Sequence, residues 1–206
     1  MPGLSIVVPA HNSGPRLRET LQQLVRELDR DDVEVIIVEN GSSDDTWEIA
    51  EELAPGSWGF PVRIFRSEVG LGAAYLKGAS EARGEVALLT ADDLPFGVTD
   101  IRSWESVGDP SALVIGSKAH PGSVVPRSKL RAVMSWGYRF LRRVILGMTV
   151  GDCQGTLFVN RTWLQRHIPL LREHGYLAST EIVHLAQVDR RRVVEVPVVT
   201  ARALTK

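Results

Sequence analysis

Short, unbroken apolar runs alternate with helical patterns along this 206-residue chain, and this alternation is the feature that most limits its possible folds. The first run, residues 4–9, is rich in β-branched side chains, which is typical of a strand covered on both faces. Further apolar runs follow at residues 33–38, 62–66 and 85–89. Helical spacing of apolar side chains occurs between the runs, over residues 16–28, 43–53 and 71–83. Three strand–helix units in succession predict a parallel sheet with helices on both faces.

The second half of the chain is less regular but continues the α/β pattern. Strands are predicted over residues 112–115, 155–159 and 192–199, and helices over residues 128–146, 162–173 and 178–188. Pro197 favours an edge position for the last strand, because proline has no N–H to donate to a neighbouring strand. We therefore expect an α/β fold, a single domain over residues 1–206 with a mostly parallel central sheet flanked by helices.

Composition excludes several classes of protein. A hydrophobic share of 44% and a charged share of 24% supply a globular core and exclude a disordered chain. The net charge of -1 argues against nucleic-acid binding through bulk charge. The one cysteine, Cys153, cannot form an internal disulfide and favours a reducing compartment. No apolar run approaches the roughly 18 residues of a membrane span and no signal peptide is visible, so we expect a cytoplasmic protein.

Positive charge is concentrated between residues 110 and 151, where no acidic residue occurs. The basic residues in this stretch are Lys118, Arg127, Lys129, Arg131, Arg139, Arg142 and Arg143. Charge alone leaves two interpretations open. The stretch is either a solvated helix face paired with acids elsewhere, or a surface that meets the phosphate of a lipid headgroup or of a substrate.

Polar residues and glycines follow four of the predicted strands at the point where each strand ends. They are Pro9, His11 and Asn12, then Glu39 and Asn40, then Gly70 and Gly72, and finally Asp92 and Asp93. Ligands of open α/β sheets bind outside the carboxyl ends of the strands, so we expect these residues to converge. The adjacent carboxylates of Asp92 and Asp93 suit Mg²⁺ or Mn²⁺ bound to a diphosphate. The alternative is that this pair forms a helix cap or a surface turn.

Longer motifs carry a family resemblance. They are SIVVPAHN from Ser5, VIIVENGSSDDT from Val35, GLGAAYLKGASEARGEVALL from Gly70, TADDLPFG from Thr90, GSK at Gly116, VGDCQGTLFVNR from Val150 and VVEVPV from Val193. Together they resemble a family 2 glycosyltransferase of the GT-A fold, and within it the polyprenyl-phosphate sugar synthases such as the dolichyl-phosphate mannose and glucose synthases. The resemblance implies an inverting enzyme that moves a sugar from a nucleotide-diphosphate donor to a polyprenyl phosphate, with Mg²⁺ or Mn²⁺ as cofactor.

The resemblance also implies roles for individual residues, with the nucleotide in the half formed by residues 1–97. The implied donor-binding residues are Pro9, His11, Asn12, Glu39, Asn40, Gly72, Asp92, Asp152 and Gln154. Ala91-Asp92-Asp93 matches the family's DxD motif, which gives Asp92 and Asp93 the metal-binding and catalytic roles. Several positions depart from the family pattern. His11 stands where relatives usually carry an aromatic residue, and Glu39 and Asn40 stand where they carry two aspartates. Ala91 replaces the first aspartate of the DxD motif, and Pro95 stands where some relatives carry a further metal ligand.

The half formed by residues 98–206 is expected to bind the acceptor. The implied acceptor-phosphate residues are Lys118, Arg127, Arg131 and Ser135, and Arg131 is also expected to be catalytic. Arg131 and Ser135 are four residues apart on a predicted helix and therefore share a face. Apolar residues predicted on the opposite face suit peripheral contact with the inner face of a membrane, directly or through a membrane partner protein. These apolar residues are Leu130, Met134, Leu141, Val144 and Met148.

Alternatives stay open at this point. A relative that uses a hydroxyl acceptor would need a general base, for which Glu181 is the matching carboxylate. The departures at Asn40, Ala91 and Pro95 also allow a nucleotide-sugar-binding protein without catalysis. A redox protein of the Rossmann type is the weakest alternative, because no glycine-rich turn follows the first strand.

Overall fold

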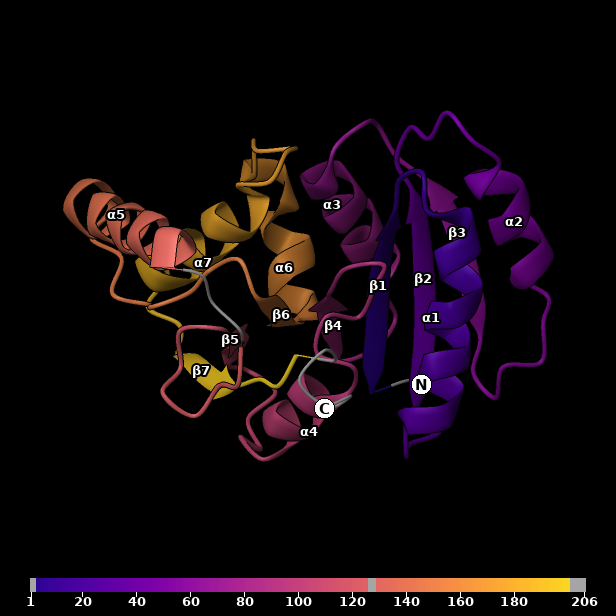
Figure 1. The fold of residues 1–206 in the computed structure, drawn as a ribbon, viewed down its shortest axis with the longest axis horizontal. Coiled ribbons are helices and arrows are strands. Elements are labelled where there is room, and N and C mark those ends of the chain that lie inside the picture. The colour runs from indigo at the N-terminus through magenta and orange to yellow at the C-terminus, as the bar shows by residue number, and fades with distance from the viewer. Residues whose placement is uncertain (1–2, 126–128, 201–206) are drawn as a thin grey trace.

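The computed structural model describes residues 3–125 and 129–200, with residues 129–135 as backbone alone. It shows one seven-stranded sheet with helices on both faces (Figure 1). In chain order the elements are β1 (Leu4–Ala10), α1 (Gly14–Glu27), β2 (Val33–Glu39), α2 (Thr46–Leu53), β3 (Val62–Arg66), α3 (Leu71–Glu81), β4 (Val86–Leu89), α4 (Thr99–Glu105), β5 (Leu113–Ser117), α5 (Lys129–Leu146), β6 (Thr156–Asn160), α6 (Arg161–His167), the 3₁₀ helix η1 (Ile168–Leu170), α7 (Ala178–Val188) and β7 (Val193–Pro197).

The strands lie in the order β3-β2-β1-β4-β6-β5-β7 across the sheet. β1 is parallel to β2 and β4, β2 is parallel to β3, and β5 is parallel to β7. Only β6 among these strands runs antiparallel to its neighbours, β4 and β5. The expected mostly parallel sheet is confirmed, and β7 occupies the edge position that Pro197 indicates.

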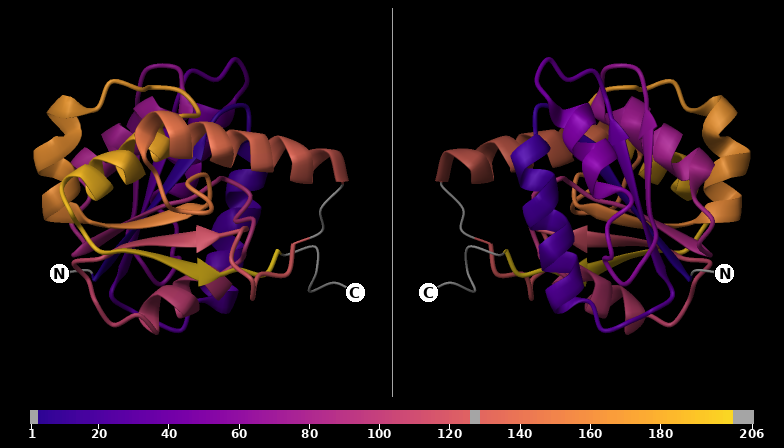
Figure 2. Two further views of the ribbon diagram at one scale, coloured as in Figure 1. Left: turned by 90° about the vertical axis from the view of Figure 1, so that its left-hand side faces the viewer. Right: turned by 90° about the vertical axis from the view of Figure 1, so that its right-hand side faces the viewer.

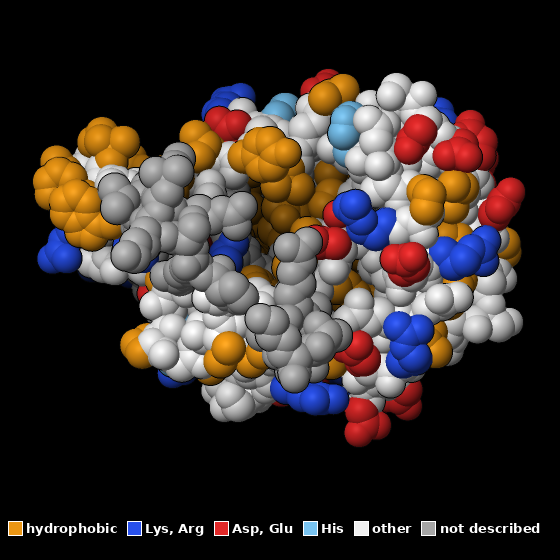
Figure 3. Space-filling model, in the orientation of Figure 1, with side chains coloured by type: hydrophobic (Ala, Val, Ile, Leu, Met, Phe, Trp, Pro, Cys, Tyr) orange, Lys and Arg blue, Asp and Glu red, His pale blue; other side chains and the backbone are white. Residues whose placement is uncertain are grey.

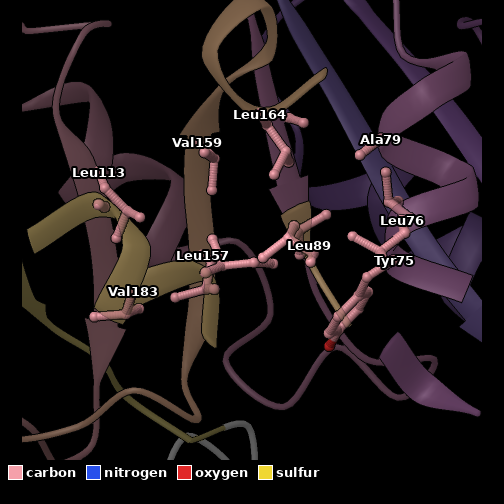
Figure 4. Packing of buried hydrophobic residues seen from close by; sticks show 14 of the residues in the cluster. Tyr75, Leu76, Ala79, Leu89, Leu113, Leu157, Val159, Leu164 and Val183 are labelled. Atoms are coloured by element: carbon pink, nitrogen blue, oxygen red, sulfur yellow. The ribbon is translucent and has the colours of Figure 1, made fainter. Parts of the chain in front are cut away.

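Two hydrophobic cores cover the two faces of the sheet, because alternate residues of each strand point to opposite faces. On one face, α3, α6 and α7 contribute Leu76, Leu164 and Val183 to a core that includes Leu89 and Leu157 of the sheet (Figure 4). On the other face, α1, α2 and α4 cover the sheet, with buried side chains from each of these helices. Burial on both faces explains why the strands are continuous apolar runs in the sequence.

Two helices differ from their predicted extents by three residues or more at one end, and one helix was not predicted. α2 begins at Thr46 and not at Ser43, because Ser42 and Ser43 contact Asn12 and so do not cap the helix. α6 ends at His167, and a short 3₁₀ helix follows, since Pro169 has no N–H for an α-helical hydrogen bond. α4 was not predicted, because seven residues are too few to show a helical period.

α5 lies across one end of the molecule, and its first turns extend past the sheet (Figure 2). The helix turns Arg142 inward, and Trp136, Phe140 and Ile145 are 63%, 58% and 67% exposed. Leu141 and Val144 are exposed as expected, but Met148 lies beyond the end of α5 and is buried, so its predicted place on the outer face is wrong. None of the described helices is long and apolar enough to cross a membrane.

Candidate active site

One edge of the sheet collects the residues that the sequence singles out. β1, β2, β4 and β5 all run in the same direction, so the segments that follow them emerge at this edge. β6 runs in the opposite direction, and its start therefore lies at the same edge. Asp152 and Gln154 directly precede β6, which explains how residues from the second half of the chain reach the ends of the first strands.

The turns after β1 and β2 are interlocked by hydrogen bonds. The Asn12 N–H donates to Ser42 Oγ over 3.0 Å, and Asn12 Oδ1 accepts from the Ser43 N–H over 2.8 Å. His11 Nδ1 lies 3.2 Å from the carbonyl oxygen of Asn40. Asn12 has a φ of 51°, a left-handed conformation that asparagine adopts more readily than most residues. His11, Asn12 and Asn40 are thus brought together at the carboxyl end of β1, the strand in which Pro9 is buried.

Glu39 and Asn40 are buried at the end of β2. Glu39 Oε1 accepts from the Ser42 N–H, and Oε2 lies 3.7 Å from Arg66 Nε. Asn40 Oδ1 is buried and has no hydrogen-bond partner among the described residues. An unpaired buried carbonyl costs about 1–3 kcal/mol, so a ligand N–H at this position would remove a penalty.

Asp92 and Asp93 follow β4 at the same edge. Arg16 Nη1 lies 3.0 Å from Asp92 Oδ2 and supplies a basic group beside the adjacent carboxylates. Asp93 is exposed. Within the described ranges, no group of three or more His, Cys, Asp and Glu side chains could hold a metal ion. An ion bound by Asp92 or Asp93 would have to take its other ligands from water and phosphate, as Mg²⁺ commonly does.

A cavity of about 60 Å³ connects the end of β4 with the second half of the chain. Its lining includes Tyr75, Thr90, Ala91, Lys118 and Gln154. The Tyr75 hydroxyl donates to the Thr90 carbonyl oxygen over 3.0 Å, and burial, together with the charge of Asp92, raises the pKa of this phenol. The hydroxyl therefore stays protonated. Figure 3 shows the molecule hollowed between its two halves, with hydrophobic side chains lining the hollow and charged side chains beside it.

Asp152 fixes the positions of Lys118 and Gln154, two of the polar residues that line this cavity. Its Oδ2 accepts from the Lys118 N–H and its Oδ1 accepts from the Gln154 N–H, each over 2.9 Å. Lys118 Nζ lies 3.4 Å from the Gln154 carbonyl oxygen. Both carboxylate oxygens of Asp152 thus bind backbone, and Lys118 and Gln154 are the members of this group that face the cavity.

Gly72 lies at the start of α3, under the segment that precedes α7. A Cβ at Gly72 would lie 2.6 Å from the Glu173 carbonyl oxygen, so only glycine allows this segment to approach. Glu181 holds the same segment, because its carboxylate accepts from the N–H groups of Arg172 and Glu173 over 2.9–3.0 Å. The structure does not bring Gly72 into the lining of the 60 Å³ cavity.

Three of the predicted acceptor residues lie outside the side chains that the structure describes. Arg127 lies outside the described residues, and Arg131 and Ser135 lie in the part of α5 whose side chains are not described. Cys153 is buried, and burial raises the pKa of its thiol. A thiol in that state is a poor nucleophile.

A sequence model described as Glycosyl transferase family 2 matches residues 5–168. The chain belongs to glycosyltransferase family 2. The dolichyl-phosphate beta-glucosyltransferase of Homo sapiens is 28% identical over 217 residues, which cover 95% of this chain and 66% of that protein. The dolichol-phosphate mannosyltransferase of Pyrococcus furiosus is 30% identical over 147 residues, which cover 69% of this chain and 41% of that protein. The family 2 chain thus spans two thirds or less of the length of these relatives.

Solved structures confirm the GT-A fold of this family 2 domain. The mannosyltransferase PcManGT from Pyrobaculum calidifontis, in complex with GDP-Man and Mn²⁺, has a TM-score of 0.60 and is 20% identical. The match covers 97% of this chain and 57% of that one.

Three residues of the family 2 domain contact the site but were not predicted from the sequence. Arg16 pairs with Asp92, Tyr75 lines the cavity, and Glu195 of β7 accepts a hydrogen bond from the Asp152 N–H. Arg16 and Glu195 are far in sequence from their partners, so neither pair forms a local pattern. The one available signal was that Tyr75 and Glu195 lie within two of the motifs that carry the family resemblance.

Proposed function

We propose that this chain is an inverting glycosyltransferase that moves a sugar from a nucleotide-diphosphate donor to a polyprenyl phosphate. One observation carries the proposal: the turn with Asp92, the cation of Lys118 and the polar Gln154 meet around one cavity at the ligand-binding edge of the sheet. Membership of family 2 and the similarity to two dolichyl-phosphate sugar transferases support the same reaction.

The donor would bind over the ends of β1, β2 and β4. His11, Asn12, Glu39 and the unpaired Oδ1 of Asn40 offer hydrogen-bonding groups for a base and ribose above Pro9. Asp92 and Asp93 would hold Mg²⁺ or Mn²⁺, which when bound would balance the charge of the departing diphosphate. Gly72, Asp152 and Gln154 would lie at the border of the donor site. Asp152 would hold Gln154 and Lys118 in place through its hydrogen bonds to their backbone N–H groups.

The acceptor phosphate would lie beside Lys118, with Arg127, Arg131 and Ser135 as its further partners. One of its oxygens attacks the anomeric carbon, the new carbon–oxygen bond forms as the bond to the diphosphate breaks, and the configuration inverts. A phosphate is already anionic near neutral pH, so the reaction needs no general base. The contacts of Glu181 agree with a reaction without a general base, because its carboxylate accepts hydrogen bonds from two backbone N–H groups.

The outer face of α5 is the feature that favours a membrane-bound acceptor. Trp136, Phe140 and Val144 recur at intervals of four residues and are all exposed, with Arg143 beside them. In Figure 3, hydrophobic side chains gather over α5 at the left of the molecule. An exposed apolar helix face with basic residues suits peripheral contact with an anionic lipid surface, so we propose that this helix rests on the inner face of a membrane or on a membrane partner.

The first test is a thermal-shift screen of uridine, guanosine, cytidine and thymidine diphosphates, each with and without Mn²⁺. A diphosphate present at 100 times its Kd would stabilise the native state by about 2.7 kcal/mol. For a chain of this size, that corresponds to a rise in Tm of roughly 5–10 °C. We expect one diphosphate to give this shift only in the presence of metal.

The second test measures transfer of radiolabelled glucose or mannose from UDP-glucose or GDP-mannose to a short-chain polyprenyl phosphate and to the matching polyprenol. We expect label in the phosphate alone and a loss of about 100-fold or more in Lys118→Ala, because a charge-assisted contact to the phosphate is removed. Lys77→Ala is the matched control, since Lys77 pairs with Glu81 on α3.

Two results would contradict the proposal. Label in the polyprenol would indicate a hydroxyl acceptor. Binding of a diphosphate without transfer to either lipid would instead indicate a nucleotide-sugar-binding protein without catalysis.

A further inference from the structure

Glu195 is a charged side chain of β7 that the proposed reaction does not use, and it ties two site segments together. Its Oε1 accepts from Ser117 Oγ over 2.5 Å and from the Asp152 N–H over 3.0 Å. Its Oε2 accepts from the Gly151 N–H over 2.7 Å. One carboxylate thus joins the end of β5 to the loop that precedes β6.

These three hydrogen bonds need a carboxylate. An ionised carboxylate accepts at both oxygens, whereas an amide offers one oxygen and one NH₂ group. In Glu195→Gln, the NH₂ group would face a backbone N–H, that of Gly151 in one orientation and that of Asp152 in the other. A Cβ at Gly151 would lie 3.2 Å from Glu195 Oε1, so glycine allows the loop to come this close.

The segments that Glu195 joins carry Lys118 and Gln154, two of the polar residues of the 60 Å³ cavity. Ser117 directly precedes Lys118, and Asp152 in turn accepts from the N–H groups of Lys118 and Gln154. The chain of contacts runs from Glu195 through Asp152 to both residues. The geometry points to Glu195 as a positioning residue that holds Lys118 and Gln154 in fixed positions relative to each other. This inference rests on the proposed function for its catalytic consequence, and on the hydrogen bonds alone for its structural part.

Glu34 provides a matched control at the opposite edge of the sheet. Its Oε1 accepts from Ser5 Oγ over 2.6 Å and from the Arg83 N–H over 2.7 Å, and its Oε2 accepts from Arg63 over 3.2 Å. Glu34 thus makes the same kind of contacts as Glu195, a serine hydroxyl and backbone at a strand end. Ser5 and Glu34 lie at the starts of β1 and β2, away from the carboxyl ends.

The structural part is tested by amide hydrogen exchange in the wild type, Glu195→Gln and Glu34→Gln. We expect Glu195→Gln to accelerate exchange about tenfold or more at Lys118, Gly151, Asp152 and Gln154, because the loss of one hydrogen bond in this network is worth about 1.4 kcal/mol or more. Glu34→Gln should accelerate exchange at Arg83 and leave the site amides unchanged. Unchanged exchange at Lys118 in Glu195→Gln would overturn the inference.

The catalytic part is tested by kcat/KM for sugar transfer to a short-chain polyprenyl phosphate, at a temperature well below the Tm of each variant. We expect a loss of about tenfold or more in Glu195→Gln and less than about twofold in Glu34→Gln, because only Glu195 orders the reacting groups. Equal losses in the two variants would make Glu195 merely structural. A wild type that transfers no sugar would defeat the proposed function, while the exchange result would still decide whether Glu195 joins the two segments.

Discussion

Asp100 is a buried carboxyl that contacts the start of β6, next to the site. It lies in α4, is 2% exposed, and its Oδ2 accepts from Thr156 Oγ1, the first residue of β6, over 2.6 Å. Burial raises the pKa of Asp100 to about 6, against an ordinary value near 3.8. Between these two pH values the folded state keeps the proton that the unfolded state releases. The stability that the protonated carboxyl contributes is therefore lost as the pH rises from about 4 through about 6.

This shift predicts that Asp100→Asn stabilises the protein at alkaline pH. The amide oxygen can accept from the Ile101 N–H, and the NH₂ group can donate to Thr156 Oγ1, since a hydroxyl accepts as well as donates. The amide therefore leaves no charge to bury. At pH 8 the gain should be on the order of 3 kcal/mol, and near pH 4 it should vanish. Thermal unfolding of both proteins at the two pH values is the measurement. An equal difference in Tm at both pH values would contradict the raised pKa.

At the level of residues, the sequence predicts the site best where the partners follow strand ends. His11, Asn12 and Asn40 meet as expected because parallel strands end at one edge. Lys118 meets Gln154 for a different reason, because the antiparallel strand β6 begins at that edge. Arg16 and Glu195 could not be predicted, because Arg16 lies 76 residues from Asp92 and Glu195 lies 43–78 residues from its partners, so no local spacing connects them. A side chain that acts across the sheet leaves no periodic signal in the sequence.

α5 is the element whose exposed face carries a prediction. The rings of Trp136 and Phe140 stack with centroids 5.8 Å apart on the outer face, so replacing both by serine removes the largest exposed apolar group of the helix. We expect Trp136→Ser/Phe140→Ser to weaken binding to vesicles of phosphatidylglycerol about tenfold or more, since burial of apolar area drives insertion at the interface. Co-sedimentation at low salt measures this binding.

The double variant should keep its Tm within about 1 °C, because exposed positions contribute little to the stability of the native state. Val25→Ser is the control, since Val25 is exposed on α1, which covers the sheet far from α5 in sequence. If the control loses as much vesicle binding as the double variant, or if neither loses any, α5 is not the membrane-contacting element.

At the level of elements, the strands were easier to predict than the helices. Residues 62–66 and 178–188 are confirmed without change as β3 and α7. The extents of α2 and α6 were wrong for local reasons, side-chain contacts of two serines and the proline at position 169. The antiparallel direction of β6 has no signature in its five residues, yet this direction is what delivers Asp152 and Gln154 to the site.

On the scale of the whole molecule, the two halves meet in one continuous sheet. β4 of the first half pairs with β6 of the second, so the proposed donor and acceptor sides share one sheet as their support. The proposed division, residues 1–97 for the nucleotide and residues 98–206 for the acceptor, is therefore a division of loops along one sheet edge. The segment before β6 crosses this division, because Asp152 and Gln154 are proposed to serve both sides.

This division predicts two separate patterns of amide protection. The diphosphate that stabilises the protein, added with Mn²⁺, should slow exchange in residues 10–13, 39–43 and 90–93 and leave residues 136–146 of α5 unchanged. Vesicles that contain a polyprenyl phosphate should protect α5 and the segment around Lys118, and leave the turns after β1 and β2 unchanged. At saturation, amide exchange in each protected segment should slow about tenfold or more, which corresponds to about 1.4 kcal/mol of local stabilisation.

The matching nucleoside without phosphates is the control for the first pattern. Protection of both halves by either ligand alone would mean that the donor and acceptor sites are not divided as proposed.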